Sequence, residues 1–117
     1  METLNQPVKV LLAEDVPTDA ELVKREVKKV LPGSVFKLVE TSDDFKNAIV
    51  TFTPDIVLSD YRMPTFDGMS ALKITLELSP GTPVIIVTGS INEETAVICM
   101  KAGAVDYVLK DSLKRLG

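Results

Sequence analysis

Ionisable and hydroxyl side chains follow the ends of four short apolar runs in this 117-residue sequence. Glu14 and Asp15 follow the first run, Asp60 and Thr88 end two later runs, and Lys110 follows the last. If these runs are strands of a parallel sheet, their carboxyl ends share one edge, which is where open α/β sheets bind ligands. We therefore expect three carboxylates, one hydroxyl and one ammonium group to meet in one crevice.

Three neighbouring carboxylates need a compensating charge. Two unit charges about 4 Å apart repel by roughly 4 kcal/mol at an effective dielectric constant of about 20. Either the pKa values rise or a cation binds. The sequence has no histidine, and its only cysteine, Cys99, lies away from these residues. A hard divalent cation such as Mg²⁺, bound by oxygen ligands together with a phosphate group, therefore fits best.

The same residues then predict phosphoryl chemistry. A carboxylate such as Asp60 can act as a nucleophile and form an aspartyl phosphate. Lys110 and Thr88 would supply a positive charge and a hydroxyl donor for the phosphoryl oxygens. Alternative roles stay open: Lys110 could form only a salt bridge, Thr88 could cap a helix or pack, and Glu14 with Asp15 could face the positive end of a helix.

Five short apolar runs are the candidate strands that position these groups. Three of them are nearly continuous in hydrophobicity, as strands are when helices cover both faces of a parallel sheet. The five runs are Val8–Ala13, Val35–Val39, Ile56–Ser59, Val84–Thr88 and Val105–Leu109.

Helical patterns lie between the runs. The first begins with the capping-box sequence Thr18-Asp19-Ala20-Glu21, and Ser42 is the expected cap of the second. The third spans Gly68–Leu78 and the fourth Asn92–Lys101. Strands and helices that alternate in this way predict a doubly wound parallel sheet.

Composition and charge narrow the class of protein. The length fits one domain, and a net charge of -4 argues against direct contact with nucleic acid. No run of 18 apolar residues and no leader-like core is present, so we expect no membrane insertion and a cytoplasmic protein. A single cysteine is consistent with a reducing compartment.

These residues resemble the receiver domain of two-component response regulators, the CheY-like family. The resemblance implies a flavodoxin-like, five-stranded parallel sheet in the order 2-1-3-4-5. The matching segments, which span nearly the whole chain, are Glu14-Asp15, Asp60-Tyr61-Arg62-Met63-Pro64, Asp67-Gly68, Thr88-Gly89, Gly103-Ala104, Asp106-Tyr107 and Lys110.

The resemblance also implies roles for these residues. Asp60 would accept a phosphoryl group from a phosphohistidine of a partner kinase, with Lys110 and Thr88 assisting. Mg²⁺, with Mn²⁺ as an alternative, would be bound by Asp15, Asp60, the backbone carbonyl of Arg62 and, directly or through water, Glu14. Thr88 and Tyr107 would form a switch pair that changes the surface of the fourth helix and fifth strand.

Two positions depart from the family pattern. Receivers commonly have proline after the lysine, with a cis bond, but Asp111 follows Lys110 here. A cis bond before a residue other than proline costs about 2.5 to 4 kcal/mol, so the isomer of this bond stays open. The first acidic position holds Glu14 where many receivers have aspartate, which leaves open how directly it binds the metal.

The family resemblance sets the expected domain and partners. We expect one receiver domain over residues 1–117, with a fifth helix that begins at Asp111-Ser112 and is incomplete at Gly117, after about one and a half turns. The chain would then be a fragment of a hybrid sensor kinase or multidomain regulator. Expected partners are a sensor histidine kinase or phosphotransfer domain and a second copy bound through the fourth helix and fifth strand. The domain would assist its own phosphorylation and dephosphorylation without being an enzyme in its own right.

Three other functions compete with a phosphorylated receiver. An Mg²⁺-dependent phosphatase with an aspartyl nucleophile would have an Asp-x-Asp pair after its first strand and a substrate-binding cap. A flavodoxin-like binding module would have a phosphate loop rich in Ser, Thr and Gly, where this chain has Glu14 and Asp15. A degenerate receiver that only binds partners would lack some of the key residues, and all of them are present.

Overall fold

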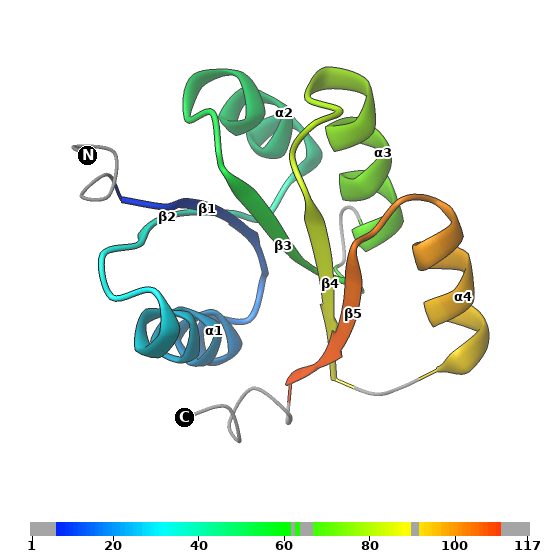
Figure 1. The fold of residues 1–117 in the computed structure, drawn as a ribbon, viewed down its shortest axis with the longest axis horizontal. Helices are drawn as coiled ribbons and strands as arrows, with labels where there is room; N and C mark the ends of the chain where they lie inside the picture. The colour runs from blue at the N-terminus through cyan, green and yellow to red at the C-terminus, as the bar shows by residue number, and fades with distance from the viewer. Residues whose placement is uncertain (1–6, 62, 64–66, 90–91, 111–117) are drawn as a thin grey trace.

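The computed structural model describes residues 7–61, 63, 67–89 and 92–110. Its strands form one parallel sheet in the order β2-β1-β3-β4-β5 (Figure 1). This confirms the expected fold class and strand order. The strand bounds are β1 Lys9–Ala13, β2 Val35–Val39, β3 Ile56–Asp60, β4 Val84–Thr88 and β5 Asp106–Leu109.

The described residues form four helices, and three of these begin at a polar cap. The side chains of Thr41, Asp67 and Asn92 accept hydrogen bonds from the N–H groups of Asp44, Ser70 and Thr95. Each bond satisfies one of the N–H groups that the first turn of a helix leaves without a partner. The helix bounds are α1 Pro17–Val30, α2 Ser42–Thr51, α3 Gly68–Leu78 and α4 Glu93–Lys101.

Two expected helix caps are wrong. The first helix begins at Pro17, so Thr18 lies inside it, and the cap residue Val16 makes no side-chain hydrogen bond. Proline at the first helical position has its φ angle already set for a helix, and this outweighs the capping-box pattern. The second helix is capped by Thr41 instead of Ser42, which is its first residue.

Helices cover both faces of the sheet (Figure 1). On one face, Phe45 of α2, Leu72 of α3 and Cys99 of α4 pack in one cluster with residues of the central strands, including Val57 and Ile86. The opposite face is covered by α1, whose Ala20 and Val23 pack in a second cluster with Val10, Leu12, Leu58 and Val87. The central strands are thus buried on both sides, which explains their continuous apolar sequences.

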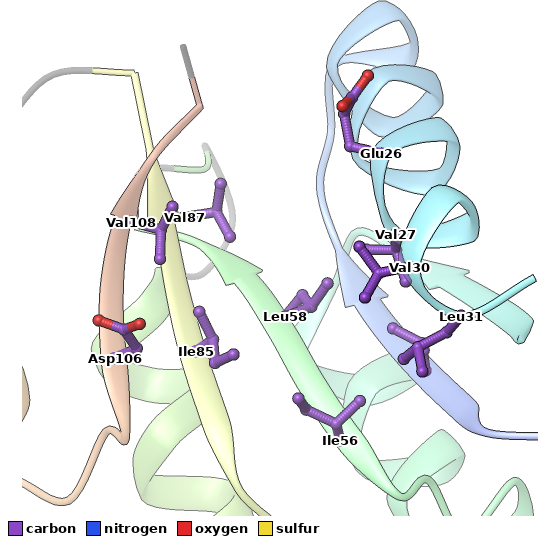
Figure 2. Close-up of a pocket in the computed structure, with 11 residues that line it drawn as sticks. Glu26, Val27, Val30, Leu31, Ile56, Leu58, Ile85, Val87, Asp106 and Val108 are labelled. Carbon is purple, nitrogen blue, oxygen red and sulfur yellow. The ribbon is translucent and has the colours of Figure 1, made fainter. Parts of the chain in front are cut away.

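An apolar groove of about 280 Å³ lies on the α1 face (Figure 2). It runs between the last turns of α1 and the strands β3, β4 and β5, and two acidic side chains, Glu26 and Asp106, also line it. The expected fifth helix, from Asp111 onward, lies outside the described residues. No helix in the described part of the chain has the length and apolar character that a membrane span requires.

Candidate functional site

Sheet register places the expected site residues along one edge. Asp60 is aligned with Val87 on β4, one position before Thr88, and Thr88 is aligned with Leu109 on β5, one position before Lys110. On the other side, Ala13 is aligned with Ser59, so Glu14 follows β1 at the level of Asp60. The carboxyl ends of four strands therefore meet at one edge, as expected.

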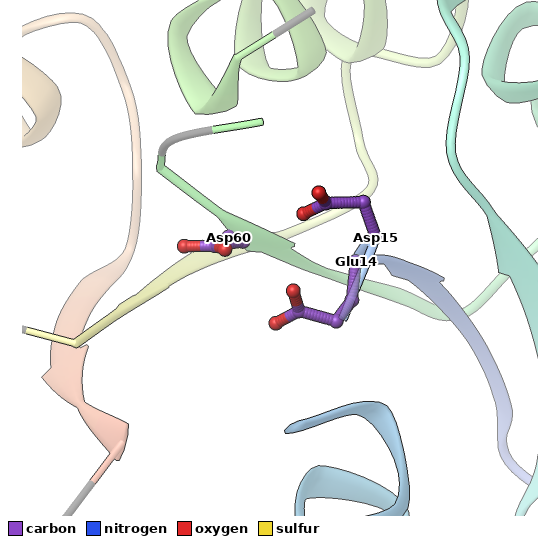
Figure 3. A group of neighbouring side chains, drawn as sticks. All are labelled: Glu14, Asp15 and Asp60. Carbon is purple, nitrogen blue, oxygen red and sulfur yellow. The ribbon is translucent and has the colours of Figure 1, made fainter. Parts of the chain in front are cut away.

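Glu14, Asp15 and Asp60 form an acidic trio (Figure 3). One carboxylate oxygen from each lies within 4.8 Å of the others, and all three side chains emerge at the carboxyl ends of β1 and β3. Glu14 and Asp60 are buried, and Asp15 is half-buried. Closely spaced carboxylate oxygens without sulfur or imidazole are a donor set that suits Mg²⁺. The residues present therefore fit the expected metal.

Lys110 places its ammonium group against this trio. Its Nζ lies 2.7 Å from Glu14 Oε1, 3.3 Å from Asp60 Oδ2 and 2.7 Å from Asp19 Oδ2. Burial lowers the pKa of Lys110, but the hydrogen bonds with Asp19 and Glu14 and the nearby carboxylate charges outweigh burial and raise the pKa above its usual value. The lysine is therefore a fixed cation, and it forms the salt bridge that was one of its two expected roles.

Glu14 is the most enclosed carboxylate of the site, with only 2% of its surface exposed. Burial raises the pKa of Glu14 above its ordinary value, and hydrogen bonds from Lys110 and the Val16 N–H partly oppose this. Its Oε2 accepts the Val16 N–H at 3.2 Å, just before α1 begins. Glu14 therefore also contacts the start of a helix, which was its expected alternative role.

Thr88 and Tyr107 lie on the neighbouring strands β4 and β5. Thr88 is buried at the end of β4, and it does not cap α4, whose cap is Asn92. Tyr107 is half-buried on β5 opposite Ile86, and it packs against the cluster formed with α2, α3 and α4. A buried hydroxyl and a packed aromatic ring thus lie on neighbouring strands.

The segment after β3 returns close to the strand end. The Gly68 N–H donates a hydrogen bond to the Tyr61 carbonyl at 2.9 Å, and Asp67 caps α3. Asp67 and Gly68 therefore open the next helix, as expected. Arg62, whose carbonyl is the fourth expected metal ligand, and Asp111, which decides the bond after Lys110, lie outside the described residues.

Comparison with known proteins decides the family. Residues 10–116 match the family described as the response regulator receiver domain. This chain is a member of that family. As a receiver domain, it is a phosphoacceptor module of two-component signalling, and the family match favours this function over the phosphatase and flavodoxin-like alternatives.

Two similar proteins are much longer than this chain. It is 41% identical over 78 residues to the DNA-binding transcriptional regulator NtrC of Proteus hauseri, a match of 67% of this chain and 16% of that protein. It is 34% identical over 101 residues to a protein-glutamate methylesterase/protein-glutamine glutaminase of Archaeoglobus fulgidus, covering 81% and 28% of the two chains. Only a small part of each relative is therefore matched.

A solved receiver domain has the same fold. The signal receiver domain of a Luxo repressor protein from Vibrio parahaemolyticus is 29% identical to this chain and superposes with a TM-score of 0.80. The match covers 94% of this receiver domain and 86% of the other.

The sequence did not point to Asp19 as part of the receiver's site. It was assigned only to a capping box, but its carboxylate contacts Lys110 across 91 positions of sequence. One signal was available, because Asp19 lies four residues after Asp15 and in the first turn of the helix that leaves the crevice.

Proposed function

We propose that Asp60 of this receiver domain accepts a phosphoryl group from a phosphohistidine of a sensor histidine kinase or phosphotransfer domain. An Asp60 carboxylate oxygen would attack phosphorus as the bond from the histidine nitrogen to phosphorus breaks. The electron pair of that bond would return to the imidazole ring, and Asp60 would become an aspartyl phosphate. The observation that supports Asp60 is its position, at a buried strand end between an acidic pair and a fixed lysine.

Lys110 and Thr88 would assist the transfer. The Lys110 ammonium lies 3.3 Å from Asp60 Oδ2, so a short movement would bring it to a phosphoryl oxygen. Thr88 follows Val87, the β4 residue that is aligned with Asp60. Its hydroxyl would donate a hydrogen bond to another phosphoryl oxygen. Fixed donors at such positions stabilise charge that develops during phosphoryl transfer.

The acidic trio would hold the metal. Asp15, Asp60 and the Arg62 carbonyl would bind Mg²⁺ or, as an alternative, Mn²⁺, with Glu14 bound directly or through water. When bound, the divalent cation supplies positive charge between the carboxylates and the phosphoryl oxygens. The carboxylate oxygens within 4.8 Å of one another support this assignment.

Thr88 and Tyr107 would convert phosphorylation into a surface change. A phosphoryl group adds a charge of about -1.5 to -2, which would draw the Thr88 hydroxyl toward it and let the half-buried Tyr107 ring move inward. The surface of α4 and β5 would then change. Exposed apolar side chains of α4, Val97, Ile98 and Met100, support this surface as the contact with a second copy.

The test is the intact mass of the protein after incubation with acetyl phosphate, with and without Mg²⁺. We expect wild type to gain one phosphoryl group only with Mg²⁺, and Asp60→Asn to gain none. Asp43→Asn removes an exposed carboxylate from the first turn of α2 and serves as the matched control. Equal labelling of Asp60→Asn, or no labelling of wild type, would contradict the proposed function.

A further inference from the structure

The ammonium group of Lys110 has more acidic partners than the proposed chemistry needs. An ammonium has three N–H donors, and three carboxylates lie within 3.3 Å of this one. The two short contacts, each 2.7 Å, are with Glu14 and Asp19, and the contact with Asp60 is the longest at 3.3 Å. In this conformation the lysine is therefore held mainly by carboxylates other than the proposed phosphoacceptor.

Asp19 differs from the other two partners in origin and exposure. It comes from α1 instead of a strand end, and 36% of its side chain is exposed, compared with 1% for Glu14 and 10% for Asp60. A half-exposed carboxylate that loses its partner is solvated by water, but a buried one is not. The contact with Asp19 is therefore the least costly of the three to break.

We propose that Asp19 is a positioning residue, which holds Lys110 on the α1 side of the crevice until phosphorylation of Asp60 draws the ammonium away. This inference rests on the proposed function of Asp60. The phosphoryl group has a larger negative charge than the single carboxylate of Asp19, so it attracts the ammonium group of Lys110 more strongly. Lys110 moves toward the phosphoryl oxygens, and Asp19 becomes hydrated. The Asp19 contact thus competes with the phosphoryl group for the same cation.

This competition predicts that loss of the Asp19 charge strengthens binding of a phosphoryl mimic. Asp19→Asn keeps the size of the side chain but makes it a weaker partner for an ammonium group. The probe is beryllofluoride with Mg²⁺, titrated into the full chain. We expect binding about fivefold tighter than wild type, a ratio that corresponds to roughly 1 kcal/mol.

Glu21 provides the matched control on the same helix. It lies two residues away, is 76% exposed and pairs with Lys24 at 3.6 Å, so Glu21→Gln removes the same charge without touching Lys110. We expect beryllofluoride to bind Glu21→Gln as it binds wild type. Asp19→Glu restores the carboxylate and is expected to return the affinity toward that of wild type.

A double substitution separates positioning from simple charge repulsion. In a Lys110→Met background, Asp19→Asn has no ammonium to release, so we expect its effect to fall to that of Glu21→Gln. If Asp19→Asn tightens binding equally with and without Lys110, the carboxylate acts by charge alone and the positioning role is wrong. Equal affinity of Asp19→Asn and wild type would also contradict it.

A readout without any phosphoryl mimic tests the pair itself. In the unligated protein, we expect the ¹⁵Nζ signal of Lys110 to show slow hydrogen exchange in wild type and in Glu21→Gln, and faster exchange in Asp19→Asn. An unchanged Lys110 signal in Asp19→Asn would overturn the inference. Failure of wild type to bind beryllofluoride would instead contradict the proposed function of Asp60, so the two failures are distinguishable.

Discussion

Gly68 illustrates how one residue without a side chain keeps the site compact. A Cβ atom at this position would lie 3.0 Å from the Tyr61 Cα and 3.2 Å from the Asp60 carbonyl oxygen. Both neighbours are backbone atoms, which cannot turn away as the end of a flexible side chain can. The absence of a side chain therefore lets α3 begin directly beside the end of β3.

We predict that Gly68→Ala destabilises the domain by about 1 to 3 kcal/mol, the usual cost of forcing an extra group into packed structure. Urea unfolding measures the free energy. Gly81→Ala is the matched control, because a Cβ there would meet nothing within 4 Å. It should change the stability by less than about 0.5 kcal/mol. Equal stabilities for the two variants would show that the close approach of the Gly68 backbone to the end of β3 does not affect the free energy of unfolding.

Residues at strand ends were the predictable part of the site. Glu14, Asp60 and Thr88 could be grouped from sequence because the carboxyl ends of parallel strands share an edge. Asp19 was harder to group with them, because its contact with Lys110 depends on where α1 begins and how the helix is rotated about its axis. The capping-box pattern favoured a start near Thr18, and Pro17 moved it earlier.

At the scale of elements, the starts of α2, α3 and α4 each have a single polar cap. Asn92 Oδ1 accepts the Thr95 N–H at 2.9 Å at the start of α4, the helix that follows Thr88 in the chain. The remaining first-turn residues, Glu93 and Glu94, have the charge that the positive end of a helix favours. The sequence predicted a helix over Asn92–Lys101, and the structure has Asn92 as its cap and Glu93 as its first residue. Asparagine just before a helical pattern is a usual start signal.

We predict that Asn92→Ala lowers the free energy of unfolding by about 1 kcal/mol, because it leaves an N–H of the first turn without its side-chain acceptor. Asn92→Ser keeps an oxygen that can accept the same bond and should retain most of the stability. Chemical denaturation of the three proteins provides the comparison. If the serine and alanine variants are equally destabilised, the loss comes from another interaction of Asn92.

At the scale of the whole molecule, metal binding to the acidic trio should stabilise the fold. A ligand that binds only the native state adds about 2.7 kcal/mol at a concentration 100 times its dissociation constant. We therefore expect Mg²⁺ to raise the thermal unfolding midpoint of wild type, and to do so less for Asp15→Asn. Asp43→Asn, which removes an exposed carboxylate outside the trio on the first turn of α2, should respond as wild type does.

Ionic strength needs its own control in this experiment, because any salt screens repulsion among the carboxylates. KCl at matched ionic strength should have a smaller effect than MgCl₂. Equal shifts with the two salts, or an unchanged response in Asp15→Asn, would contradict a specific metal site.

The fold class and the strand order were predictable from the sequence. The expected fifth helix lies outside the described residues. The alternation of apolar runs and helical patterns predicted the doubly wound sheet, and the family resemblance added the strand order. The groove beside α1 had no sequence signal, because it depends on which helices cover β3, β4 and β5. The single-domain assignment with an incomplete fifth helix stays a prediction.

The strand order also constrains how the chain can fold as it is synthesised. The strand made first, β1, lies inside the sheet between β2 and β3, so its inner edge pairs only with residues from Ile56 onward. Contacts between distant parts of a chain form late, because closing a long loop costs entropy first. During synthesis on the ribosome, one edge of the apolar segment Lys9–Ala13 therefore has no strand to pair with until about half of the domain has emerged. This interval exposes the chain to aggregation, and it ends when β3 pairs with β1.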